Sequence, residues 1–86
     1  MTFYKIVIKP GAERDLKGID MAVLPRIAGA IDGLASNPRG TNTQKIKGSA
    51  EDYRLRVGSY RILYKIYEKE KVVDVFAIKH RREAYR

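Results

Sequence analysis

The spacing of hydrophobic residues changes near Thr43, from the spacing typical of helices to the alternation typical of strands. Before Thr43, hydrophobic residues recur every three or four positions in two stretches, as on a helix face that packs against a core. The first predicted helix begins at Pro10 and ends near Gly18. The second begins at Asp20 or at Leu24 after a short link, so the two helices should run antiparallel.

Extended segments are predicted before and after these helices. Gly58-Ser59 separates two alternating segments and is typical of a tight hairpin turn. The predicted strands cover residues 2–8, 53–57, 60–67 and 72–78, with a short extended piece at 44–47. An antiparallel helical hairpin on one face of a mostly antiparallel sheet of about four strands would bury both hydrophobic sets. We therefore expect a single α+β domain over residues 1–86, with the other face of the sheet left for function.

Positive charge is concentrated in the strand part of the chain. The formal net charge is +8; residues 44–86 hold twelve lysines and arginines against six acidic residues, whereas residues 1–43 hold six against four. Five of the six tyrosines also lie in residues 44–86. Cations mixed with aromatic rings suit phosphate contact and base stacking, which favours a nucleic acid or another polyanion as partner. The alternative is a solvated basic surface that keeps the protein soluble.

Several classes of chemistry are excluded by composition. The chain has no cysteine and one histidine, which excludes a disulfide framework, a thiolate zinc site and a ribonuclease built on two histidines. We find no serine–histidine–aspartate pattern, no glycine motif for phosphate and no carboxylate cluster for metal-dependent cleavage. No hydrophobic run approaches the roughly 18 residues that span a bilayer, and the first residues lack a secretory core. A cytoplasmic protein without membrane contact is therefore expected.

The remaining chemistry depends on arginine, lysine and tyrosine. In an extended segment, alternation sends Arg54 and Arg56 to one face and Tyr53, Leu55 and Val57 to the other. The planar guanidinium fork matches phosphate oxygens. Preorganised guanidinium groups can also stabilise the negative charge that builds up when the 2′-hydroxyl of RNA attacks the adjacent phosphorus. Because arginine stays protonated, the base in such a reaction would be a lysine or a tyrosine.

Three stretches of the strand part together resemble the RelE/ParE superfamily of bacterial toxins. They are Tyr53-Arg54-Leu55-Arg56, then Gly58-Ser59-Tyr60-Arg61-Ile62-Leu63-Tyr64, then His80-Arg81-Arg82 with Tyr85. The resemblance extends over nearly the whole chain, through Pro10-Gly11-Ala12-Glu13-Arg14-Asp15-Leu16 and Asn37-Pro38. It implies the RelE-like fold and a type II toxin that is a metal-independent endoribonuclease, needs no cofactor and cuts mRNA in the ribosomal A site. It also implies two partners, the ribosome with bound mRNA and a cognate antitoxin, which should be acidic where it meets the basic face.

The resemblance assigns a role to each matching position. It implies that the catalytic set is Arg61, Arg81 and Tyr85. It implies that the RNA-binding set is Lys45, Lys47, Arg54, Arg56 and Arg82, where Arg82 is an alternative register for Arg81. Arg54 and Arg56 stand where the best-known RelE members have lysines, so a proton-accepting role of those lysines cannot transfer. Our hypothesis is that Tyr85 takes the proton, aided by the surrounding cations.

Two other functions remain open on the sequence. Members of the ParE branch share the fold but inhibit DNA gyrase by binding it, without nuclease chemistry, and that branch generally lacks the full catalytic set. The other alternative is a non-catalytic RNA-binding module or a degenerate toxin. For Arg61 itself, the alternative is a surface cation paired across strands with Asp74 or Glu68.

Overall fold

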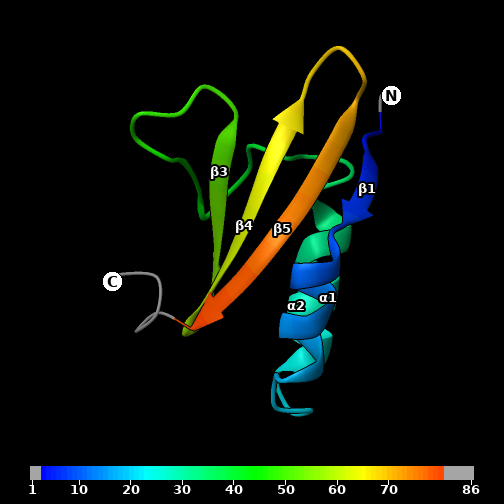
Figure 1. The fold of residues 1–86 in the computed structure, drawn as a ribbon, viewed down its shortest axis with the longest axis vertical. Helices are drawn as coiled ribbons and strands as arrows, with labels where there is room; N and C mark the ends of the chain where they lie inside the picture. Colours follow the sequence, from blue (N-terminus) through cyan, green and yellow to red (C-terminus); the bar gives the residue numbers. More distant parts are fainter. Residues whose placement is uncertain (1–2, 81–86) are drawn as a thin grey trace.

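The computed structural model describes residues 3–80, which form two helices and five strands (Figure 1). In chain order these are β1 (Lys5–Ile8), α1 (Pro10–Lys17), α2 (Leu24–Gly33), β2 (Thr43–Lys45), β3 (Asp52–Val57), β4 (Tyr60–Tyr67) and β5 (Val72–His80). Both helices lie on one side of the sheet (Figure 1). The predicted α+β class and the helical layer on one sheet face are therefore confirmed.

The strands form one sheet in the order β1-β5-β4-β3-β2. All neighbours pair antiparallel except β1 and β5, which pair in parallel, with Lys5 opposite Val72. The sequence predicts about four strands, and the fifth is β2, which is short but pairs with β3. The β3–β4 hairpin turns at Gly58, whose φ of 58° lies in the left-handed region that glycine adopts without strain.

Proline positions set the starts of both helices. Pro10 occupies the first turn of α1, where its missing N–H would have no partner in the helix. The second helix begins at Leu24 and not at Asp20, because residues 21–23 form a separate turn. In that turn the Asp20 carboxylate accepts the N–H of Ala22 at 2.9 Å, and Pro25 follows within the first turn of α2.

The core lies between the helices and the sheet. Its α2 side is formed by Ile27, Ile31 and Leu34, at most 3% exposed. Its sheet side is formed by side chains of β4 and β5 that are fully buried, namely Ile62, Tyr64, Val73 and Val75. The opposite face of the sheet, which we call the open face, is not covered by α1 or α2. Within residues 3–80, no helix is both long and apolar enough to cross a membrane.

Tyr64 adds a polar anchor to this core. Its hydroxyl donates a hydrogen bond to the carbonyl of Pro38 at 2.6 Å. Its ring stacks on that of Tyr53, with ring centroids 5.9 Å apart. Burial raises the pKa of the Tyr64 hydroxyl from 10.0 to about 12. Tyr64 therefore joins the segment after α2 to the centre of the sheet.

Replacement of Tyr64 by phenylalanine should change how stability depends on alkaline pH. The pKa of Tyr64 is raised on folding, so the stabilisation held by its neutral hydroxyl is complete below pH 10 and is lost as the pH rises toward about 12. Near neutral pH, Tyr64→Phe should cost about 1 kcal/mol, because the Pro38 carbonyl loses its donor. In urea unfolding, the stability difference between the parent and the variant should shrink in the alkaline range. An equal difference at neutral and alkaline pH would contradict this account.

Candidate functional site

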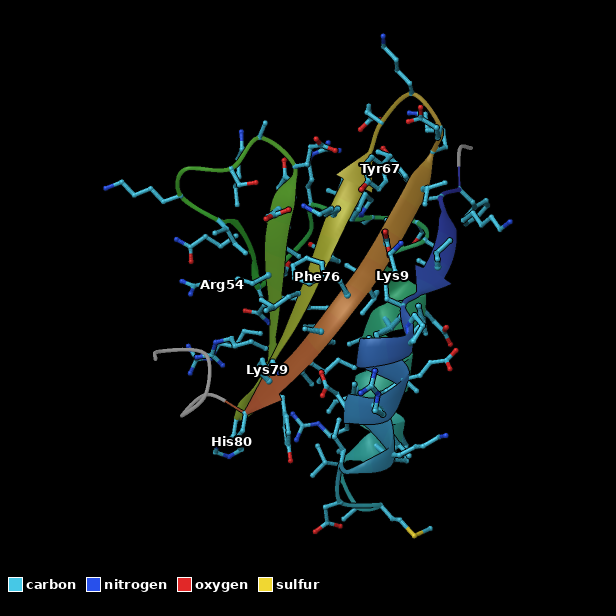
Figure 2. All side chains as sticks on the ribbon, viewed as in Figure 1. Lys9, Arg54, Tyr67, Phe76, Lys79 and His80 are labelled. Atoms are coloured by element: carbon cyan, nitrogen blue, oxygen red, sulfur yellow. The ribbon has the colours of Figure 1, made fainter. Side chains whose placement is uncertain are left out.

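Cations meet at the hairpin end of the open face. Across the strands, Arg56 of β3 lies opposite Arg61 of β4, and Arg61 lies opposite Lys79 of β5. Arg54 lies two residues along β3 on the same face, opposite Leu63. Figure 2 shows Arg54 and Lys79 on the side of the sheet that the helices leave uncovered. Like charges directly opposite each other destabilise a sheet, so this arrangement favours a bound anion.

The three arginines line a single hollow of about 280 Å³. Its other walls are the uncharged side chains of Asn42, Thr43 and Gln44. The Gln44 amide oxygen accepts a hydrogen bond from Nη2 of Arg54 at 2.8 Å, which orients that guanidinium group. None of the described residues that line the hollow is acidic. The hollow can therefore hold a negatively charged group against several N–H donors.

Arg61 is nearly buried, with an exposed fraction of 6%. Its Nη1 donates to the carbonyl of Tyr60 at 3.2 Å. A buried guanidinium group is costly unless its surroundings compensate its charge, so the position of Arg61 is not that of an ordinary surface cation. The guanidinium group is held by the fold before any ligand binds.

Asp74 and Glu68, the two acidic residues that could pair with Arg61, each pair with another residue. Asp74 lies opposite Lys65 in the sheet and forms an ion pair with Lys9 at 3.4 Å. Glu68 accepts from the Tyr4 hydroxyl and pairs with Arg39 and Lys71. The interpretation of Arg61 as a surface cation paired with Asp74 or Glu68 is therefore wrong.

Away from the hairpin end, two described cations of the open face lie beside acidic residues. Lys65 forms an ion pair with Asp52, in addition to the pair between Lys9 and Asp74. The Lys65 ammonium also lies over the ring of Phe76, 5.6 Å from the ring centroid. Among the described residues of β3, β4 and β5, the cations of the open face that have no acidic residue opposite them in the sheet thus lie where β3 and β4 turn.

The structure does not bring all the predicted site residues together. Lys45 lies opposite Tyr53, whose ring stacks on buried Tyr64, so Lys45 is on the helix side of the edge strand. Lys47 lies in the turn that follows β2 and is exposed. The roles of both lysines in binding RNA stay predictions, without support from the geometry of the arginine hollow.

Three predicted site residues, Arg81, Arg82 and Tyr85, lie outside the described residues. His80, the last described residue, ends β5, and its ring meets the edge of Tyr60 with centroids 5.3 Å apart. The catalytic assignments of Arg81 and Tyr85 and the RNA-binding assignment of Arg82 therefore stay predictions.

Sequence reasoning missed two residues of the site, Lys79 and Gln44. The strand predicted from the sequence ends at Ile78, which leaves Lys79 outside the sheet, whereas β5 continues to His80. Gln44 is an uncharged residue on a short edge strand, and its role depends on the pairing that sets it opposite Arg54. Within residues 3–80, no three histidine, cysteine or acidic side chains gather as they would to hold a metal ion.

Comparison with known proteins extends these observations. Residues 6–85 match the family model described as the ParE toxin of the type II toxin-antitoxin system parDE. A Methanocaldococcus jannaschii protein that carries the name RelE1 is 27% identical over 86 residues, with 96% of each chain covered.

Solved structures show the same similarity. The toxin-antitoxin complex RelBE2 of Mycobacterium tuberculosis contains a chain that is 25% identical, with a TM-score of 0.83 and 94% of each chain covered. The archaeal RelE-RelB complex of Pyrococcus horikoshii contains one that is 28% identical, with a TM-score of 0.80, covering 94% of this chain and 97% of that one. The Escherichia coli RelE toxin is 18% identical, and its TM-score of 0.78 shows the shared fold.

Proposed function

Because the chain belongs to the ParE/RelE family of toxins of type II toxin-antitoxin systems, we propose that it is an endoribonuclease that cleaves mRNA in the ribosomal A site. The single observation that carries the proposal is the convergence of Arg54, Arg56 and Arg61 on one hollow that none of the described acidic residues lines. Such a site suits a phosphate whose negative charge grows during reaction.

The proposed reaction is an internal transfer at phosphorus. The 2′-oxygen forms a bond to the adjacent phosphorus and the bond to the 5′-oxygen breaks, which leaves a 2′,3′-cyclic phosphate and a 5′-hydroxyl. A proton leaves the 2′-hydroxyl and another reaches the departing 5′-oxygen. Arg61, held before substrate binds, would donate to the non-bridging oxygens as their charge increases, while Arg54 and Arg56 hold the phosphate in place.

The proton transfers require a group other than these arginines, because arginine remains protonated in proteins. Tyr85 is the proposed acceptor, aided by neighbouring cations, and Arg81 the proposed second donor to the phosphate. The proposed partners are the ribosome with bound mRNA and an acidic antitoxin, and the proposed location is the cytoplasm. Support for the antitoxin comes from the RelB complexes in which the similar toxin chains were solved.

Inhibition of DNA gyrase is the second candidate function. It is favoured by the family model, which is named for the ParE toxin and matches residues 6–85. Against it, a purely protein-binding inhibitor has no need for a nearly buried arginine aligned with two further cations.

Controlled expression followed by mapping of mRNA 5′ ends separates the two functions. Induction of the parent chain should stop growth and produce new 5′-hydroxyl ends within translated coding regions, while plasmid supercoiling stays normal. Growth arrest with intact mRNA and altered supercoiling would contradict the nuclease proposal and support gyrase inhibition.

A further inference from the structure

One wall of the arginine hollow is built from two uncharged amide side chains, Asn42 and Gln44, with Thr43 between them. From this wall we infer a subsite for a nucleobase of the bound RNA, in which Asn42 reads adenine. The inference rests on the proposed function and adds the base that the chain prefers beside the bound phosphate. The hollow, of about 280 Å³, is larger than a single phosphate group fills, so a neighbouring part of the nucleotide can enter it.

The amide of Gln44 is already engaged by Arg54. Its oxygen accepts a hydrogen bond from Nη2 of Arg54 at 2.8 Å, so only the N–H groups of that amide remain for a ligand. N–H donors alone suit the oxygens of phosphate and ribose, which carry no information about the base. Gln44 is therefore a positioning residue for Arg54, and the base must be read by another group.

Asn42 has its whole amide to offer. Its side chain is exposed, lines the hollow and forms no hydrogen bond within residues 3–80. The amide therefore presents an acceptor oxygen beside N–H donors. The backbone carbonyl of Asn42 accepts a hydrogen bond from the N–H of Arg56 at 3.0 Å, which holds Asn42 next to one of the three arginines.

The backbone at Asn42 also favours this residue type. Its φ of 67° lies in the left-handed region, which asparagine and aspartate adopt more readily than most other residues with a side chain. An aspartate here would add a negative charge to a hollow that is to hold a phosphate, and a glycine would leave no side chain. Asparagine both fits the backbone and presents a neutral pair of donor and acceptor to the hollow.

Adenine matches a free amide on two of its edges. Its N6–H donor lies beside an acceptor nitrogen on both the Watson–Crick edge and the Hoogsteen edge, so an amide can bind either edge through two hydrogen bonds. Cytosine and uracil offer such a pair only on the Watson–Crick edge, and guanine presents two acceptors on its Hoogsteen edge. The unpaired bases of single-stranded RNA expose both edges. Adenine is therefore the base that Asn42 should favour.

Two residues with left-handed backbones provide a matched test. Within residues 3–80, the residues other than glycine with a positive φ are Asn42 and Lys71, whose φ is 56°. Glycine adopts this backbone without strain, so neither Asn42→Gly nor Lys71→Gly should unfold the protein. Asn42→Gly removes the amide from the hollow, whereas Lys71→Gly makes the same backbone change in the turn before β5, outside the hollow. Asn42→Asp keeps the size of the side chain but loses its N–H donors.

The probes are oligo(A), oligo(U) and oligo(C) RNAs of one short length, titrated onto the purified chain. A homopolymer presents the same base to the subsite in every register, and binding is measured without any need for cleavage. The parent should bind oligo(A) about 10-fold more tightly than oligo(U) or oligo(C), as for one bidentate contact to a base. Asn42→Gly and Asn42→Asp should lose this preference, and Lys71→Gly should keep it.

Three results would overturn the adenine subsite. The first is equal binding of the three RNAs by the parent, and the second is a preference for oligo(A) that survives in both Asn42 variants. The third is an equal loss of affinity for all three RNAs in Asn42→Gly, which would assign Asn42 to the RNA backbone. A parent that prefers oligo(A) but does not cut mRNA would contradict the nuclease proposal and still support the subsite.

Discussion

Replacement of Arg61 by alanine should lower the rate of mRNA cleavage by about 10²- to 10³-fold, the usual effect of removing one preorganised donor to a developing charge. Arg61 is 6% exposed and lies between Arg56 and Lys79 across the strands. Its guanidinium group therefore needs little reorganisation when charge grows on the phosphate. The loss should appear mainly in the rate at saturating substrate, since the interaction strengthens in the transition state.

Single-turnover cleavage of mRNA on stalled ribosomes measures this effect directly. Arg61→Lys keeps the charge but not the planar fork, so it should fall between the parent and Arg61→Ala. Lys69→Ala, in the exposed turn before β5, is the matched control and should cut like the parent. Thermal unfolding shows whether Arg61→Ala is folded. A folded Arg61→Ala that cuts at the parental rate would remove Arg61 from the mechanism.

Much of the fold could be predicted because its signals are local. The two-residue turn at Gly58-Ser59 follows from glycine and from alternation on both sides, and β4 covers the predicted residues, Tyr60–Tyr67. The parallel pairing of β1 with β5 could not be predicted in this way. That pairing depends on packing between segments that are distant in sequence. The start of α2 at Leu24 depends on whether residues 21–23 continue the helix, a choice that Asp20 leaves open.

The arginine hollow was partly predictable for the same reason. Alternation places Arg54 and Arg56 on one face, and a two-residue turn after Val57 sets Arg56 opposite Arg61. Lys79 could not be placed, because an irregularity between Leu63 and Tyr64 shifts the register of β4 against β5.

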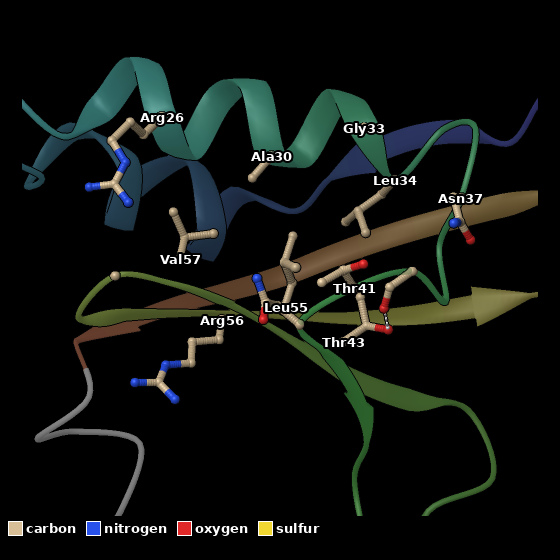
Figure 3. A pocket seen from close by; sticks show the side chains of 13 residues that line it. Arg26, Ala30, Gly33, Leu34, Asn37, Thr41, Thr43, Leu55, Arg56 and Val57 are labelled. Carbon is tan, nitrogen blue, oxygen red and sulfur yellow. Dashed lines mark hydrogen bonds between the residues drawn. The ribbon is translucent and has the colours of Figure 1, made fainter.

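A groove of about 420 Å³ between α2 and β3 carries no sequence signal at all. It forms where α2 lies against β3, and the loop between the two elements closes its far end (Figure 3). Gly33 and Arg26 are unremarkable in the helical pattern, and only the packing of α2 on the sheet brings them to the groove. Local sequence therefore predicted the cations of the arginine hollow but not the groove beside α2.

The central claim is that Arg54, Arg56 and Arg61 together hold a phosphate of RNA, and the salt dependence of RNA binding tests it most directly. The dissociation constant of a short single-stranded RNA is measured over a range of salt concentrations for the parent, for Arg54→Ala/Arg56→Ala and for Lys69→Ala. Each lost phosphate contact should reduce the slope of log affinity against log salt by about 0.7.

For the double variant, the slope of log affinity against log salt should thus be about 1.4 smaller in magnitude than for the parent. It should also lose about 100-fold in affinity at low salt, since each charged hydrogen bond contributes about 1.5 kcal/mol or more. Lys69→Ala should keep the parental slope. A double variant with the same affinity as the parent and the same slope of log affinity against log salt would contradict the account.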